Sequence, residues 1–155
     1  MWLTFVRNHA KVMVACDFFV VITAAFRIFY VFVVMEIESR RVLHHNVTGH
    51  TTAEWTLQQF REALPGGHPY RVVIHDRDRI FSGTVDQGLT NLGVRVLRTP
   101  ILAPKANSVC ERLGGSLRRE CLDCLLPGNE RHLQMILREW TTHYNRGRPH
   151  AALGA

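Results

Sequence analysis

Three carboxylates stand at positions where they could hold divalent metal ions. Asp17 lies in an apolar, strand-like run, residues 15–19 (Ala-Cys-Asp-Phe-Phe). Asp76 follows the apolar run 72–74 (Val-Val-Ile), and Glu111 comes after a further strand-like segment and a loop. Mg²⁺ and Mn²⁺ prefer oxygen ligands, and two such ions can clamp the attacking and leaving oxygens of a phosphodiester. Acids from two strands and a helix therefore predict a two-metal phosphoryl-transfer site.

Each acid has a competing interpretation. A buried, unpaired carboxylate costs on the order of several kcal/mol, so Asp17 needs a cation, which is either a metal or an arginine. Asp76 directly follows a strand, where sites in such sheets form, whereas Asp78 is expected in the loop behind it. Glu111 shares its predicted helix with Glu120 and Asp123. At 100° per residue, Glu120 points the opposite way from Glu111.

The elements that must position these acids follow from periodicity and capping signals. Strands are predicted over 12–22, 26–36, 40–48, 70–74 and 94–97, because β-branched and aromatic residues dominate there. A capping box, Thr51 with Glu54, predicts a helix that ends before Pro65. Further helices are expected over 83–92, 107–125 and 129–144, and residues 1–11 show no clear element. This order indicates an α/β domain with a mixed sheet of about five strands flanked by helices.

Basic residues surround the third acid. Lys+Arg outnumber Asp+Glu by 19 to 13, which gives a net charge of +6, and arginine supplies nearly all of the excess. Forked guanidinium groups suit phosphate, so the balance favours a polyanionic partner; a GC-rich genome is the alternative explanation. The candidate DNA-contacting residues lie in one stretch of sequence and are Lys105, Asn107, Arg112, Arg118 and Arg119. A solvated helix face is their alternative role.

Two other classes of protein are disfavoured. The apolar stretch 12–34 is interrupted by Asp17 and Arg27, so its uncharged runs are shorter than the roughly 18 residues of a membrane-spanning helix. The four cysteines suit reduced thiols in a cytosolic protein, and Cys121 and Cys124 lack a second pair at zinc-ligand spacing.

Five segments, in order, carry a resemblance to a known family. They are residues 15–19, 74–81 (Ile-His-Asp-Arg-Asp-Arg-Ile-Phe), 104–112 (Pro-Lys-Ala-Asn-Ser-Val-Cys-Glu-Arg), 116–123 (Ser-Leu-Arg-Arg-Glu-Cys-Leu-Asp) and 143–150 (His-Tyr-Asn-Arg-Gly-Arg-Pro-His). With these segments the chain resembles the catalytic core of bacterial insertion-sequence transposases, which share a ribonuclease-H-like fold with retroviral integrases. The family places its second acid five residues before an aromatic residue, which selects Asp76 through Phe81.

The resemblance implies DNA cleavage and strand transfer by Asp17, Asp76 and Glu111, holding two Mg²⁺ or Mn²⁺ ions. It implies DNA as the partner, at least a dimer in the active complex, and a bacterial cytoplasmic protein on the nucleoid. Residues 12–150 would be the core, 1–11 a linker or upstream remnant, and 151–155 a tail. Residues 1–11 are too short for the helix-turn-helix of the family. The alternatives are an inactive DNA-binding or dimerisation remnant and a ribonuclease-H-type nuclease.

Overall fold

One mixed sheet of five strands lies at the centre of the computed structural model, which describes residues 2–76, 80–98, 108–122 and 126–147. The strand order is β3-β2-β1-β4-β5. β1, β2 and β3 form an antiparallel meander, and β4 and β5 run parallel to β1. The elements in chain order are α1 (Trp2–His9), η1 (Ala10–Val12), β1 (Met13–Ile22), β2 (Ile28–Glu36), β3 (Val42–Thr48), α2 (Ala53–Ala63), β4 (Val72–His75), α3 (Gly83–Asn91), β5 (Arg95–Arg98), α4 (Ser108–Leu117), the π-helical turn η2 (Arg118–Leu122) and α5 (Glu130–Gly147).

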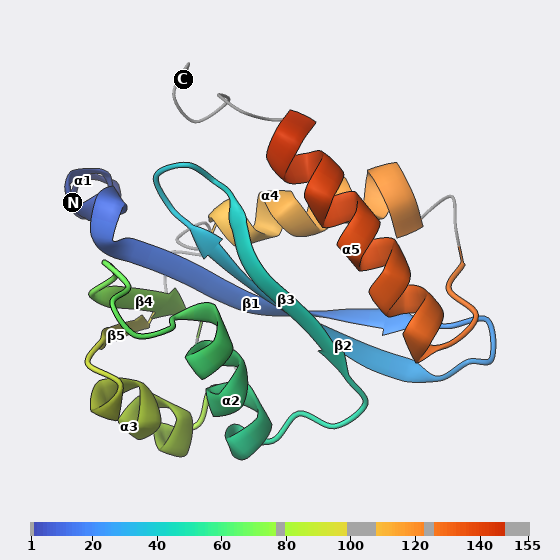
Figure 1. The fold of residues 1–155 in the computed structure, drawn as a ribbon, viewed down its shortest axis with the longest axis horizontal. Coiled ribbons are helices and arrows are strands. Elements are labelled where there is room, and N and C mark those ends of the chain that lie inside the picture. Colours follow the sequence, from blue (N-terminus) through green and yellow to red (C-terminus); the bar gives the residue numbers. More distant parts are fainter. Residues whose placement is uncertain (1, 77–79, 99–107, 123–125, 148–155) are drawn as a thin grey trace.

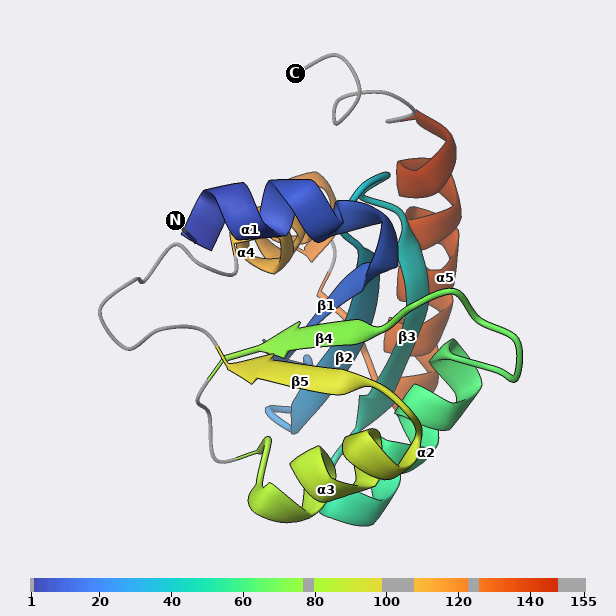
Figure 2. The ribbon, with the colours of Figure 1, turned by 90° about the vertical axis from the view of Figure 1, so that its left-hand side faces the viewer.

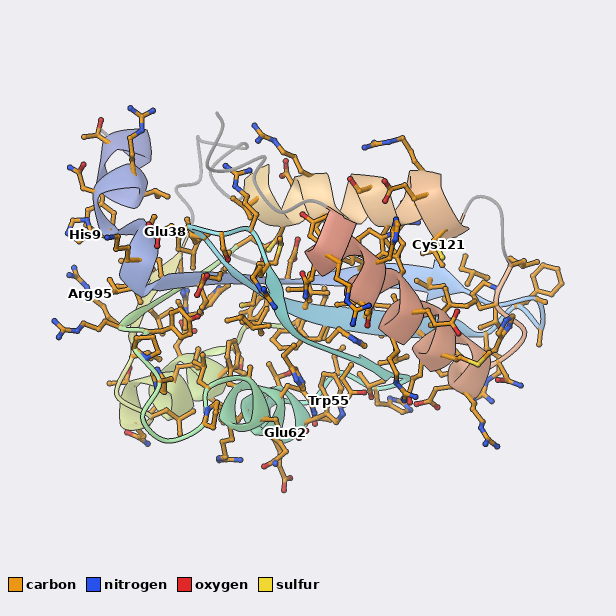
Figure 3. All side chains as sticks on the ribbon, turned by 45° about the horizontal axis from the view of Figure 1, so that its top comes forward. His9, Glu38, Trp55, Glu62, Arg95 and Cys121 are labelled. Atoms are coloured by element: carbon orange, nitrogen blue, oxygen red, sulfur yellow. The ribbon has the colours of Figure 1, made fainter. Side chains whose placement is uncertain are left out.

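Helices cover both faces of the sheet. In Figures 1 and 2, α2 and α3 lie against one face, and α4 and α5 lie against the other. Glu62, labelled in Figure 3, points from α2 away from the sheet, as the solvent side of an amphipathic helix should. The predicted α/β architecture with a five-stranded mixed sheet is confirmed.

Alternation along β1 divides the core into two clusters. Met13 and Ala15 belong to the cluster under α4 and α5, whereas Val14 and Cys16 belong to the cluster under α2 and α3. All four side chains are fully buried. Because successive side chains of a strand point to opposite faces, Asp17 lies on the α4 side.

Two local predictions at helix starts are wrong. Residues 1–11 were expected to hold no element, yet α1 forms at Trp2–His9. Its Phe5 packs against the core under α4 and α5 and stacks on the His9 ring at a centroid distance of 4.4 Å. Tertiary packing thus orders a segment whose own helical signal is weak. The cap of α2 is Thr52 rather than Thr51: the Thr52 hydroxyl accepts from the Trp55 backbone N–H at 3.0 Å.

The helix that carries Glu111 also departs from prediction. It was expected to continue as an α-helix to residue 125, but α4 ends at Leu117 and a π-helical turn follows. A π turn holds more residues than an α turn, so angles counted at 100° per residue fail beyond Leu117. Cys121, labelled in Figure 3, still reaches the core with 7% of its surface exposed.

Candidate active site

Adjacent parallel strands bring the first two acids level with each other. The β1–β4 register pairs Ala15 with Ile74. Asp17 and Asp76 each come two residues after this pair, so they are level with each other across the two strands. Neighbouring strands of a sheet are about 4.8 Å apart. Val72 and Ile74 pack into the core under α4, so alternation directs Asp76 to the same face as Asp17. Both carboxylates are partly buried there.

Glu111 reaches this region because α4 lies close to β1. A Cβ added to Gly114 would come within 2.9 Å of Phe19 Cε1, so only glycine permits this approach. Cys110 and Leu113 face the sheet and are 0% and 1% exposed, while Glu111 lies in the first turn of α4 and is exposed. Gly114 therefore determines how closely α4, which carries Glu111, packs against β1, which carries Asp17.

The Cys110 thiol is a common neighbour of the three acids. Burial raises the pKa of the Cys110 thiol well above its ordinary value, and the charges of Asp17, Asp76 and Glu111 raise it further. Burial also raises the pKa of Cys16, with smaller contributions from Cys110, Asp17 and Asp76. Cys110 thus lies within the fields of all three carboxylates, on the inner side of α4. Cys16, Cys110 and Cys121 are free thiols.

The donor set matches a hard divalent cation in its chemistry. Asp17, Asp76 and Glu111 offer only carboxylate oxygens, the ligands that Mg²⁺ and Mn²⁺ prefer. Asp17 Oδ1 accepts from the Phe18 backbone N–H at 2.8 Å, which orients that carboxylate. Across the described residues, however, no group of three or more His, Cys, Asp or Glu side chains is arranged to hold a metal ion. The acids share one region of the α4 face without forming a closed ligand set.

Of the predicted DNA-contacting residues, two lie outside the described part of the chain, two are exposed, and one is exposed and hydrogen-bonded to β1. Lys105 and Asn107 lie outside the described residues, as do Asp78, Asp123 and Cys124. Arg112 and Arg119 are exposed on the α4–η2 segment. Arg118 is also exposed, but its Nη2 donates to the Val20 carbonyl at 2.9 Å, which ties η2 to β1. Glu120, the competitor of Glu111, accepts from the Trp140 indole N–H at 3.1 Å.

Two polar features of the described residues were not predicted from the sequence. Arg40, in the turn between β2 and β3, has a positive φ of 64°, and its buried Nε has no hydrogen-bond partner within the part of the chain that is described. Burial and the nearby Arg112 guanidinium lower the pKa of Arg40. The second feature is a chain of contacts from His75 through Asp86 to Arg98. Neither has a sequence signal, because each depends on residues brought together by the sheet.

A surface pocket lies away from the acids. Its volume is about 470 Å³, and its lining includes Arg27 and Phe29 of the β1–β2 hairpin and Arg131 of α5. None of the three acids lines it. No helix in the described ranges is long and apolar enough to cross a membrane.

Comparison with known protein families gives one match, to the C-terminal part of the chain. The sequence model of the family described as "Integrase core domain" matches residues 92–155, the segment that carries Glu111. Among curated protein sequences, none matches this chain.

Solved structures extend the likeness to the rest of the chain. The catalytic domain of Mos1 transposase, in a structure with raltegravir and Mg, has a TM-score of 0.68 at 17% identity over 91% of this chain and 77% of its own. The catalytic core domain of BIV integrase has a TM-score of 0.63 at 16% identity, covering 89% and 86%. A chain of the simian T-cell lymphotropic virus intasome has a TM-score of 0.65 at 13% identity over 82% of this chain. This chain spans 47% of that intasome chain, about half its length.

The fold is therefore the ribonuclease-H-like fold that these transposase and integrase catalytic domains share. The resemblance stated from the sequence is supported: residues 92–155 match the integrase core family, and the described chain has the fold of transposase and retroviral integrase catalytic domains.

Proposed function

We propose that this chain is the catalytic core of a divalent-metal-dependent transposase that cleaves DNA and joins its strands. The observation that carries the proposal is the placement of Asp17 and Asp76 at one level on adjacent parallel strands, beneath the helix that bears Glu111. The charges of all three acids raise the pKa of the buried Cys110 thiol, which supports placing them in one region of the α4 side.

Asp17, Asp76 and Glu111 are the residues that hold the metal in this proposal. When bound, two Mg²⁺ or Mn²⁺ ions supply the charge that activates water or a DNA 3′-hydroxyl and stabilises the leaving oxygen. Asp17, on the central strand β1, would contribute its carboxylate to the site that holds the ions. Glu111 is exposed in the first turn of α4 and would supply the third carboxylate to a bound cation. No side chain serves as nucleophile, since the carboxylates only position and neutralise.

DNA would run along the exposed side of α4 and η2. Arg112, Arg118 and Arg119 are exposed there, and Lys105 and Asn107 precede the helix in sequence. Guanidinium groups contact phosphates without reading bases, so these residues would position the scissile bond rather than choose the sequence. The active complex is proposed to hold at least two copies of the chain, acting on the nucleoid of a bacterial cell.

Cleavage and strand-transfer assays on model element ends, with Mg²⁺ or Mn²⁺ titrated, test the proposal. Asp17→Asn, Asp76→Asn and Glu111→Gln should each abolish metal-dependent chemistry while the fold, followed by circular dichroism, is retained. Activity close to the parent in any one of them would remove that residue from the triad. Loss in Asp78→Asn with activity kept in Asp76→Asn would move the second ligand. A parent that binds DNA but never cuts it would favour the inactive remnant.

A further inference from the structure

A buried polar chain ends on the backbone of Asp76. His75 is completely buried, and its ring stacks on Phe81 at 4.4 Å between centroids and 13° between planes. Its Nδ1 contacts the Asp76 carbonyl oxygen at 2.5 Å, and its Nε2 contacts Asp86 Oδ1 at 2.7 Å. Both partners present acceptor oxygens, and the ring donates from whichever nitrogen carries the proton, Nδ1 to the Asp76 carbonyl or Nε2 to Asp86.

The chain continues to the surface through a charged pair. Asp86, in the first turn of α3, has 18% of its side chain exposed. Its Oδ2 accepts from Arg98 Nη2 at 2.5 Å and from Arg98 Nε at 2.9 Å. Arg98 ends β5 and has 42% of its side chain exposed. Three elements, β4, α3 and β5, are thereby linked to the peptide that follows Asp76.

Stability alone does not account for this arrangement. His75 lies in a cluster of apolar side chains under α2 and α3, where an aromatic residue of the same size would stack on Phe81 equally well. Burying a polar ring there is unfavourable unless it is hydrogen-bonded. What the polar ring adds is a fixed position for the Asp76 carbonyl. Fixing that peptide plane fixes the direction in which the Asp76 side chain leaves the end of β4.

We infer that His75 is a positioning residue for Asp76, held in place by Asp86 and Arg98, so that this chain of contacts tunes the affinity of the acids for a divalent cation. The inference rests on the proposed function, because it takes Asp76 to be a metal ligand. Residues that hydrogen-bond to metal ligands hold those ligands in position. Replacing such a residue typically lowers the metal affinity by roughly 10-fold to 100-fold.

Binding of Mn²⁺ alone to the full chain, followed by the electron paramagnetic resonance signal of free Mn²⁺, tests the inference. His75→Phe keeps the volume and the stacking but loses the polar contacts with the Asp76 carbonyl and Asp86, and it should weaken Mn²⁺ binding by about 10-fold or more. In His75→Asn the amide nitrogen takes the place of Nδ1, so donation to the Asp76 carbonyl is kept while a cavity is left. Melting temperature should therefore fall further in His75→Asn than in His75→Phe, whereas Mn²⁺ affinity should be closer to the parent in His75→Asn.

Milder variants and a control complete the experiment. Asp86→Asn and Arg98→Gln should weaken Mn²⁺ binding in the same direction as His75→Phe, and to a smaller degree. Gln87→Ala, at an exposed position beside Asp86 on α3, should bind as the parent does. Mn²⁺ affinity that simply follows melting temperature across the variants, or parent-like affinity in His75→Phe, overturns the inference. A parent that binds no Mn²⁺, or whose binding survives Asp76→Asn, overturns the proposed function as well.

Discussion

The three arginines around Glu111 differ in the contacts that their guanidinium groups already make. Arg118 donates one N–H to Val20 while the rest of its guanidinium stays exposed. Arg119 lies back over Gly115, where an added Cβ would come within 3.0 Å of its Nη1. Arg112 lies close enough to Arg40 for its charge to lower the pKa of that residue. Two guanidinium groups held near each other favour an anion between them.

Removing positive charge from the exposed side of α4 and η2 should weaken DNA binding by the same amount whatever the DNA sequence. In Arg112→Ala and Arg118→Ala, the log–log dependence of affinity on salt should flatten by roughly one unit each, because one fewer counterion is released. Equilibrium binding to duplexes of unrelated sequence over a range of salt measures the slope. Arg61→Ala is the matched control, since it removes the same charge from α2 on the opposite face. A slope unchanged from the parent in both variants would place the DNA path elsewhere.

Tyr70 gives a pH dependence that is separate from the acids. Its hydroxyl donates to Glu36 Oε2, and burial followed by this hydrogen bond raises the pKa of Tyr70. The folded state therefore keeps the phenolic proton more tightly than the unfolded state. The resulting stabilisation is fully present below the unfolded pKa of about 10 and is lost as pH rises above it.

Tyr70→Phe should remove this alkaline dependence. Urea unfolding between pH 8 and pH 11 should show the parent losing stability above about pH 10 more steeply than Tyr70→Phe, with similar slopes below it. Parallel curves over the whole range would contradict the assigned role of the Glu36 contact.

At the scale of elements, the glycine pair in α4 has two distinct roles. A Cβ on Gly114 meets the Phe19 ring, whose atoms lie 2.9 to 3.3 Å away, inside the packed layer between α4 and β1. A Cβ on Gly115 meets only the end of the Arg119 side chain, which can move. The first glycine is needed for close packing, whereas the second carries only the helix penalty of glycine.

Alanine at the two positions should therefore have opposite effects. Gly114→Ala should push α4 off the sheet and destabilise the fold by about 1–3 kcal/mol, as overpacking does. Gly115→Ala should be neutral or stabilising by about 0.5–1 kcal/mol, the gain of alanine over glycine in a helix. Chemical denaturation gives both values, and Phe19→Leu added to Gly114→Ala should recover part of the loss. Equal effects at the two positions would rule out the close approach as the reason for Gly114.

The elements that could be predicted from the sequence are those whose local residue pattern is enough to specify a strand or a helix. The strands formed within two residues of the predicted bounds because runs of β-branched and aromatic residues admit few alternatives. α1 could not be predicted, because Phe5 is ordered by contact with the distant core. The π turn after Leu117 could not be predicted either, since no local signal separates it from a continuing α-helix.

At the scale of the whole molecule, the candidate site is a product of sheet topology. β4 lies beside β1 only because the chain crosses over through α2, and this places Asp76 level with Asp17. Sequence reasoning could select the acids by their strand and helix positions, but not the contacts that join His75 to Asp86 and Arg98, because these residues lie on three different elements. The fold thus places Asp17 and Asp76 on adjacent strands, while the role of Asp17, Asp76 and Glu111 as metal ligands stays a prediction.

Anomalous diffraction from crystals of the chain grown with Mn²⁺ is the most direct test of the central claim, that the three acids hold divalent metal. We predict anomalous density between the carboxylates of Asp17 and Asp76, with Glu111 turned towards it, and loss of that density in Asp17→Asn crystals. Density on other residues only, or none at Mn²⁺ concentrations that support strand chemistry, would contradict the proposed metal site.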